Sequence, residues 1–444
     1  MSKRRAVALV DGEHYPATTR WALGVARERG YEIVACLFVG GIEKIGPGEL
    51  PDLGVTVEAA TDDLGASVRA AIGRYGPDVV LDLSDEPVLG YRERAVAAAV
   101  ALAAGVEYAT GDSALRPPVD EPPLGVPALA VIGTGKRTGK TAIAGEAARV
   151  AAANGLEPIV VAMGRGGPPD PQVVEAGSLT LERLRELIAA GEHAASDYLE
   201  DAMFTGVTTI GARRAGGGPA GRPFATNVAE AARLAEKRNP GLVILEGSGA
   251  AVPTVPWDAG VLVCPASIPE EYLRGYLGPY RILLSDLIVF TMGAGPDDGP
   301  QDLSSLVSHV RGLRPDARIA LIELRPAPAG DVREKKVYFT TTAPPPAGPS
   351  LVASLEERHG CAVVGVSHRL ADRAGLAEDL DAAPAYEVLL TELKAAAIDV
   401  AAERALERGA EVVFSDNRAE TVGGDGQLED LLLETVRLAV ERKG

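Results

Sequence analysis

The sequence predicts an α/β protein in three parts: a central domain with a mostly parallel sheet, an N-terminal α/β domain and a small C-terminal α/β module. Apolar runs of strand length alternate with Ala-rich helical stretches along most of the 444 residues, as they do in open parallel sheets. Two proline-rich segments, 116–124 and 343–349, interrupt this alternation and mark boundaries. A chain of this length also exceeds the size that a single hydrophobic core usually supports.

The N-terminal part, residues 1–120, is predicted to be a Rossmann-like α/β domain. Strands are expected at 5–10, 32–39, 55–59 and 78–83, with helices at 18–29 and 66–74. Each strand is a short apolar run, and the stretches between them have the period of amphipathic helices. The alternation predicts parallel strands joined by helices.

The central part, residues 125–342, repeats the same alternation after a first apolar strand at 127–132. Further strands are expected at 157–162, 241–245, 260–264, 287–291 and 318–323. The C-terminal part, residues 350–444, is predicted to contain short strands at 362–366, 387–390 and 411–414, and a long helix at 392–408. It is therefore expected to be a separate, smaller α/β module.

A glycine-rich loop joins the strand at 127–132 to an Ala-rich helix. This layout, with Gly-Lys-Thr at the end of the loop, is that of a P-loop NTPase domain. Glycines let backbone N–H groups surround a phosphate, and the helix N-terminus adds partial positive charge. Lys140 is predicted to reach the β- and γ-phosphates of ATP as a catalytic residue, and Thr141 to hold Mg²⁺. The predicted nucleotide-binding residues are Gly133, Thr134, Gly135, Lys136, Arg137, Thr138, Gly139, Lys140 and Thr141.

The spacing of this loop and a second motif resemble those of dethiobiotin synthetase and related amide-forming ligases. The strict P-loop pattern requires glycine at position 134, where Thr134 stands, and this chain carries Gly133 one position earlier. The apolar run 242–245 ends in Glu246 followed by Gly-Ser-Gly, as in a Walker B strand. Glu246 is predicted to be a catalytic residue that orients Mg²⁺ or its water. The alternative is a buried strand that ends in a solvated carboxylate.

Arginines between glycines predict where an anionic substrate binds. Arg165 follows a predicted strand within Gly-Arg-Gly-Gly and is expected to be catalytic and substrate-binding, and Asp170 is a second candidate Mg²⁺ ligand. A tight turn with exposed charges is the alternative for both. Arg213, Arg214 and Arg222 flank a glycine-rich loop, and their guanidinium groups suit phosphates. Scattered surface arginines are the alternative there.

Two other groups of residues are candidates. Glu13 and His14 follow the first strand of the N-terminal sheet, at its ligand-binding end, and are predicted to bind substrate; a structural histidine in a turn is the alternative. A predicted helix carries His193, Ser196, Asp197, Glu200 and Asp201, with the two aspartates one turn apart. They would assist the metal or a proton transfer, or form a solvated acidic face.

Composition restricts the class of protein. The formal net charge is −18, which opposes nucleic acids and anionic membranes, so a phosphorylated substrate requires local arginines. No apolar run reaches the roughly 18 residues of a membrane helix. Cys36, Cys264 and Cys361 form no paired motif, and a structural zinc site is not expected. We therefore expect a cytoplasmic protein with reduced cysteines and no nucleic-acid or membrane partner.

Five stretches together resemble the cyclic 2,3-diphosphoglycerate synthetase family, and the resemblance runs in order over roughly residues 5–420. They are Asp-Gly-Glu-His-Tyr-Pro (11–16), the loop itself (133–141), Met-Gly-Arg-Gly-Gly-Pro (163–168), Ala-Ala-Ser-Asp-Tyr-Leu-Glu-Asp-Ala (194–202) and Gly-Tyr-Leu-Gly-Pro-Tyr-Arg-Ile-Leu-Leu-Ser-Asp (275–286). The resemblance implies ATP-dependent closure of 2,3-bisphosphoglycerate into a cyclic phosphoanhydride, with release of ADP and phosphate. We also expect a homodimer.

Two alternatives stay open at this point. One is another P-loop ligase or kinase that acts on a different phosphorylated or carboxylated metabolite, and the arginines favour a phosphate-bearing one. The other is a nucleotide-switch NTPase. A metal-delivery switch would show Cys/His clusters, and a partition ATPase would have lysine at position 135, where Gly135 stands.

Overall fold

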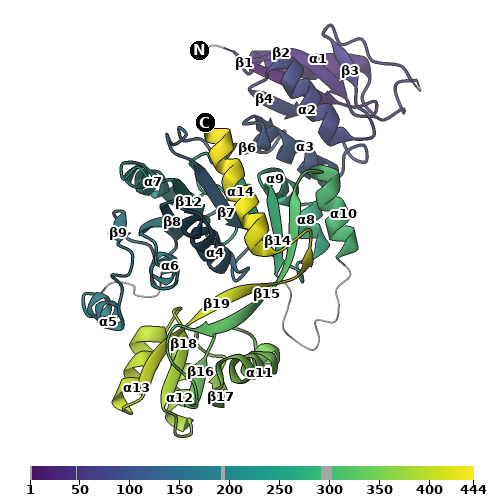
Figure 1. Cartoon of the computed structure of the whole chain (residues 1–444). Coiled ribbons are helices and arrows are strands. Elements are labelled where there is room, and N and C mark those ends of the chain that lie inside the picture. The colour runs from purple at the N-terminus through teal and green to yellow at the C-terminus, as the bar shows by residue number, and fades with distance from the viewer. Residues whose placement is uncertain (1–2, 47, 192–195, 292–302) are drawn as a thin grey trace.

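The computed structural model describes residues 3–46, 48–191, 196–291 and 303–444. The chain forms one sheet of 6 strands and one of 13, and helices pack against both (Figure 1). Most neighbouring strands in each sheet run parallel, which confirms the predicted mixed α/β fold. Among the described residues, none of the helices combines the length and the apolar character that a membrane crossing needs.

The N-terminal sheet has the strand order β3-β2-β1-β4-β5-β6. Its strands are β1 (Arg4–Val10), β2 (Tyr31–Phe38), β3 (Val57–Ala59), β4 (Val79–Asp82), β5 (Glu107–Ala109) and β6 (Ala114–Leu115); its helices are α1 (Pro16–Glu28), α2 (Leu64–Tyr75) and α3 (Tyr91–Ala103). All pairs are parallel except β5 with β6. The strand order reverses between β1 and β4, and doubly wound sheets bind ligands at such a switch point.

The larger sheet has the order β11-β10-β8-β12-β7-β13-β14-β15-β19-β18-β16-β17, with β9 paired to β10. From β10 to β15 all neighbours along this order are parallel. Its strands are β7 (Ala128–Gly133), β8 (Pro158–Gly164), β9 (Gln172–Val174), β10 (Thr209–Ala215), β11 (Ala225–Thr226), β12 (Leu242–Glu246), β13 (Ala259–Pro265), β14 (Leu287–Thr291), β15 (Arg318–Pro328), β16 (Lys336–Thr340), β17 (Ala362–Ser367), β18 (Val388–Glu392) and β19 (Glu411–Gly424).

Helices cover both faces of the parallel part of this sheet. The helices from the phosphate-binding loop to the end of the chain are α4 (Lys140–Ala153), α5 (Leu181–Ala189), α6 (Asp197–Thr205), α7 (Val228–Glu236), α8 (Glu270–Arg274), α9 (Gly278–Leu283), α10 (Ser304–Leu313), α11 (Gly348–His359), α12 (Arg373–Ala382), α13 (Glu403–Glu407) and α14 (Leu428–Lys443), with short turns η1 (Pro345–Ala347) and η2 (Ala397–Ala402). Because every residue of β7 and β12 is buried, these strands read as continuous apolar runs rather than alternating ones.

The C-terminal helix α14 returns to the central sheet. Its Leu432 and Val436 share a buried cluster with Ile143 of α4 and Leu129 of β7, and it lies beside α4 in Figure 1. The chain therefore closes on the P-loop core rather than ending in the module that precedes α14. This packing supports the position of the phosphate-binding loop, because α4 begins at that loop.

The C-terminal module is attached through the long antiparallel pair β15 and β19. β16 lies before the proline-rich segment 343–349, yet it pairs with β17 and β18, which lie after it. This pairing favours a boundary near residue 328, ahead of β16. The division into 1–120, 125–342 and 350–444 stays a proposal. The predicted helix 392–408 is shorter in the structure, because Glu392 completes the buried strand β18.

Candidate active site

The phosphate-binding loop connects β7 to α4 at the carboxyl edge of the larger sheet. Lys140 is the first residue of α4; its Nζ donates to the backbone oxygen of Gly135 at 2.7 Å and to Oγ1 of Thr138 at 3.2 Å. A Cβ on Gly133 would lie 2.8 Å from Cδ of Lys140, so glycine is required there for this lysine position. Gly139 has a φ of +91°, a conformation that glycine adopts without strain.

Glu246, the last residue of β12, lies beside this loop. Oγ1 of Thr141 donates to its Oε1 at 2.8 Å, whereas its Oε2 is buried without a hydrogen-bond partner. Burial, assisted by the charge of Asp197, raises the pKa of Glu246 to about 8. Burial also lowers the pKa of Lys140, and Glu246 opposes that effect.

The residues around Glu246 fit the predicted Mg²⁺. A carboxylate oxygen without a partner beside a threonine hydroxyl supplies hard oxygen ligands, and Mg²⁺ usually completes its shell with phosphate and water. A bound cation would also remove the cost of ionising a buried carboxylate. Thr141 and Glu246 are therefore the residues that would hold it.

A buried acidic cluster on α6 adjoins Glu246. Asp197 lines the cavity described below, whereas Glu200 and Asp201 are buried. Burial raises the pKa of Glu200 to about 7 although Lys394 opposes the shift. Burial and the charge of Glu246 raise the pKa of Asp201, whose two carboxylate oxygens have no partner in the described structure. Asp201 is thus not part of a solvated acidic face.

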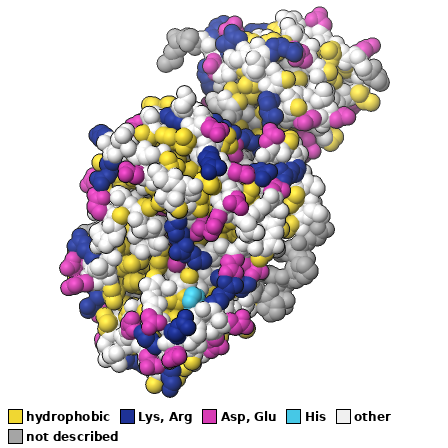
Figure 2. Space-filling view, in the orientation of Figure 1, with side chains coloured by type: hydrophobic (Ala, Val, Ile, Leu, Met, Phe, Trp, Pro, Cys, Tyr) yellow, Lys and Arg dark blue, Asp and Glu magenta, His cyan; other side chains and the backbone are white. Residues whose placement is uncertain are grey.

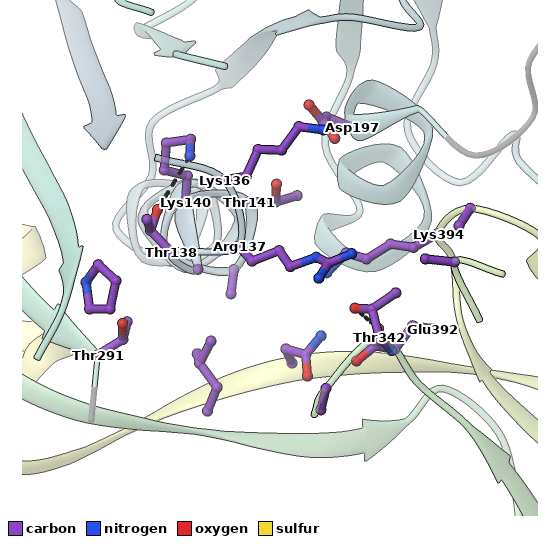
Figure 3. Close-up of a pocket in the computed structure, with 18 of the residues that line it drawn as sticks. Lys136, Arg137, Thr138, Lys140, Thr141, Asp197, Thr291, Thr342, Glu392 and Lys394 are labelled. Carbon is purple, nitrogen blue, oxygen red and sulfur yellow. Dashed lines mark hydrogen bonds between the residues drawn. The ribbon is translucent and has the colours of Figure 1, made fainter. Parts of the chain in front are cut away.

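A cavity of about 670 Å³ lies between the phosphate-binding loop and the C-terminal module. Figure 3 shows Lys136, Arg137 and Lys140 on the loop, and Thr342, Glu392 and Lys394 across from them. The charged residues that line it are Lys136, Arg137, Lys140, Arg165, Asp197, Glu246, Glu392 and Lys394. Its apolar lining comes mainly from one set of residues, here called the apolar wall: Leu324, Pro326, Phe339, Pro344, Pro346 and Leu351.

Glu392 and Lys394, at the end of β18, were not anticipated from the sequence. Glu392 accepts hydrogen bonds from the backbone N of Thr342 at 3.0 Å and from its Oγ1 at 2.8 Å. Nζ of Lys394 lies 3.3 Å from Oε1 of Glu200. Desolvation opposes its charge, but Glu200 and Glu392 together raise the pKa of Lys394, so it is a cation. A sequence signal was present, because the apolar residues 388–390 are followed by Thr391 and then by the carboxylate of Glu392, much as 242–245 are followed by Glu246.

Two of the predicted arginines lie at this cavity or behind it. Arg165, which follows β8, lines it. Arg214 of β10 is buried and donates to the backbone oxygens of Gly216 at 2.7 Å and Ser248 at 2.8 Å. Burial and the neighbouring charge of Arg165 lower the pKa of Arg214, as expected for two cations held near each other.

The other predicted residues of this part lie elsewhere. Nε of Arg213 donates to the backbone oxygen of Gly167 at 3.1 Å, and Arg222 forms an ion pair with Asp120 of the linker. Asp170 is exposed on the loop after β8. None of Arg213, Arg222 and Asp170 is among the residues that line the cavity, and their binding roles stay predictions.

Glu13 and His14 lie in the N-terminal domain, at the opposite end of the molecule from the C-terminal module (Figure 1). Asp11 organises their loop: its Oδ1 accepts from the backbone N of Glu13 at 3.0 Å and from Nδ1 of His14 at 2.8 Å. Its Oδ2 accepts from the backbone N of Asp85 at 2.6 Å. Neither Glu13 nor His14 lines the cavity, so their contact with substrate stays a prediction. His193 lies outside the described residues.

Comparison with known proteins covers nearly the whole chain. Three family models match: "Cyclic 2,3-diphosphoglycerate synthetase, N-terminal domain" over residues 5–116, the P-loop domain of the same synthetase over 128–322, and its C-terminal domain over 328–418. A protein of that name from Rubrobacter xylanophilus is 48% identical over 427 residues, which are 96% of each chain. One from Methanothermus fervidus is 38% identical over 450 residues, covering 99% of this chain and 98% of its own. One from Thermococcus gammatolerans is 40% identical over 431 residues, 96% of each.

Proposed function

This chain belongs to the cyclic 2,3-diphosphoglycerate synthetase family, and we propose that its cavity is where ATP drives the closure of 2,3-bisphosphoglycerate into a cyclic phosphoanhydride. ADP and phosphate are the other products. One observation carries the assignment of the reaction to this cavity. The cavity brings the phosphate-binding loop together with Arg165 and with Lys394 of the C-terminal module. A kinase or a nucleotide switch has less need of cations on both sides of its phosphates.

The charge of the substrate explains the cations. 2,3-Bisphosphoglycerate carries two phosphates and a carboxylate, and bringing its phosphates together in a poorly solvated site is strongly unfavourable. The net charge of −18 adds to that repulsion, although acidic and basic side chains are interspersed over the face in Figure 2. Arg137, Arg165 and Lys394 line the cavity and would offset the repulsion locally.

The proposed reaction has two phosphoryl transfers. In the first, an oxygen of one substrate phosphate attacks the γ-phosphorus of ATP, the bond from that phosphorus to ADP breaks, and a pyrophosphoryl group forms. In the second, the other substrate phosphate attacks the inner phosphorus of that group in line. The bond to the outer phosphate breaks, and inorganic phosphate leaves as the ring closes. Lys140 stabilises the charge on the transferring group, and Arg165 and Lys394 hold the two ends near attack distance.

Thr141 and Glu246 have a separate role, which is to bind the metal. Thr141 and Glu246 would hold Mg²⁺, which supplies charge neutralisation at the transferring phosphate. Because burial raises the pKa of Glu246 to about 8, this carboxyl loses its proton more readily once a cation lies beside it. We also propose that the enzyme acts in the cytoplasm as a homodimer; three free, buried cysteines agree with a reducing compartment.

The test is direct. Purified protein is incubated with ATP, Mg²⁺ and 2,3-bisphosphoglycerate, and phosphorus NMR follows ADP, phosphate and the cyclic product. We expect one ADP and one phosphate for each cyclic product, all dependent on 2,3-bisphosphoglycerate. ADP release that is independent of this compound, without a cyclic product, would overturn the proposed function. Release of a phosphorylated but open product would favour a kinase instead.

A further inference from the structure

The apolar wall of the cavity begins against the phosphate-binding loop. A Cβ on Gly139 would lie 3.0 Å from Cδ1 of Leu324, so the wall and the loop are in contact. Its other residues lie on β15, on β16, around η1 and on α11. A ligand whose phosphates bind the loop therefore has as its next neighbour an apolar surface formed by β15 and the C-terminal module.

Asn417 of β19 lies at the edge of this wall. It pairs across the strands with Pro326 and lines the cavity. Successive side chains of a strand point to opposite faces, and its neighbours face α4 instead: Arg149 lies 3.4 Å from Asp416. On the other side, Arg418 lies 3.7 Å from Glu146 of the same helix.

These ion pairs fix the strand on both sides of Asn417. The side-chain amide of Asn417 hydrogen-bonds to no described residue. Apart from the strand pairing, the one hydrogen bond of Asn417 is donated by its backbone N to Oδ1 of Asp416. The amide is partly buried and lines the cavity, so a ligand there can replace the water that otherwise satisfies it. The position is thus rigid, and its hydrogen-bonding groups are available.

The two reactants of the proposed function differ in their need for such a surface. 2,3-Bisphosphoglycerate has charged groups on all three carbons and almost no apolar area. The purine of ATP has two flat apolar faces, whose burial is favourable, and an edge of hydrogen-bond donors and acceptors. The apolar wall suits the purine, and the cations of the cavity suit the phosphates.

We propose that the apolar wall and Asn417 form the nucleobase site, and that Asn417 selects adenine; this inference rests on the proposed function. An amide can accept from N6 of adenine and donate to N7 at the same time. Guanine presents the acceptors O6 and N7 along that edge, so the amide oxygen would face O6 without a proton between them. The C-terminal module, rather than the P-loop domain, then determines which nucleotide is used.

The test is equilibrium binding by calorimetry, with Mg²⁺ and three probes: ATP, GTP and inorganic tripolyphosphate, which has no base. We expect the native protein to prefer ATP over GTP by roughly tenfold or more. Asn417→Ala should remove that preference by weakening ATP, and leave tripolyphosphate within about twofold. Asn417→Asp keeps the shape but turns an acceptor toward N7, so it should weaken ATP further. Thermal unfolding of both variants checks that they fold.

Three outcomes overturn the proposal. They are an unchanged ATP preference in both variants, a native protein that binds ATP and GTP equally, and an equal loss of ATP and tripolyphosphate. The last would mean that Asn417 acts on the loop and not on the base. If no cyclic product formed in the NMR experiment while Asn417 still selected ATP, the proposed function would fail and the nucleobase site would stand.

Discussion

The two carboxyl edges of this protein differ although the sheets behind them are built alike. At the switch point of the N-terminal sheet, the buried Asp11 accepts four hydrogen bonds from its own loops. At the edge of the larger sheet, Glu246 accepts one from Thr141, and its other oxygen has no partner. The cavity of about 670 Å³ adjoins the second of these edges, and no residue of the segment 11–16 lines it.

A structural carboxylate differs from one kept for a ligand in whether the protein satisfies its oxygens. Asp11 is also buried, but backbone N–H groups and His14 satisfy it, and it holds a loop in place. Glu246 and Asp201 retain unpartnered oxygens in a buried position, which costs free energy that packing does not recover. Position at the end of a parallel strand is therefore insufficient to identify a catalytic site.

The largest expected difference between the two edges concerns Lys140 and His14. Lys140→Ala should lower turnover by a factor on the order of 10³, because it removes a preorganised cation from the transferring phosphate. His14→Ala should change turnover by less than about twofold, because His14 does not line the cavity. The measurement is ADP release with 2,3-bisphosphoglycerate present. If His14→Ala lost as much turnover as Lys140→Ala, the reaction would be assigned to the edge of the N-terminal sheet and not to the cavity.

The dependence of turnover on Mg²⁺ distinguishes Glu246 from Asp170, the two carboxylates that the sequence predicts as Mg²⁺ ligands. Glu246→Gln should raise the Mg²⁺ concentration for half-maximal turnover by roughly 10- to 100-fold, because a charged oxygen ligand is lost. Asp170→Asn, on an exposed loop, serves as the matched control and should leave the Mg²⁺ titration unchanged. A shift with Asp170→Asn and none with Glu246→Gln would assign the metal to the loop after β8.

The KM for 2,3-bisphosphoglycerate distinguishes cations that line the cavity from cations that lie outside it. Lys394→Ala should raise the KM for 2,3-bisphosphoglycerate at least roughly tenfold, because a hydrogen bond to a charged group is lost. Arg213→Ala, whose Nε binds the backbone of Gly167, is the control and should leave that KM nearly unchanged. Initial rates at saturating ATP measure both. The reverse ranking would favour the glycine-rich loop predicted from the sequence as the substrate site.

The smallest expected effect is on stability and concerns Glu200. Its pKa is raised from 4.5 to about 7. Between these two pH values the carboxyl has lost its proton in the unfolded chain but keeps it in the folded one. The free energy of unfolding then falls as pH rises through this window, by at most about 3 kcal/mol. Glu200→Gln should flatten this fall in thermal unfolding between pH 4.5 and 7. Glu186→Gln, at an exposed ion pair, should keep the native slope.

Local pattern was enough to predict much of the fold and one half of the site. Gly133 to Thr141 and Glu246 are contiguous with the strands that place them, so their positions follow from strand and helix alternation. Lys394 and Asn417 reach the cavity only because β19 pairs with β15 across about 90 residues of chain, which local pattern does not reveal. Arg222 was predicted to bind substrate, but its ion-pair partner is Asp120. Asp120 lies in the linker, which the sequence pattern indicates only as a domain boundary.

Hydrogen exchange measured by mass spectrometry, with ADP, Mg²⁺ and 2,3-bisphosphoglycerate added together, tests most directly whether both ligands occupy the cavity. We predict protection of segments 133–141 and 390–395, because ligand contacts suppress the opening of the loop and of the end of β18. Segment 11–16 should exchange as in the free protein. Protection of 11–16, with 390–395 unchanged, would contradict the assignment of the substrate to the cavity between the P-loop and the C-terminal module.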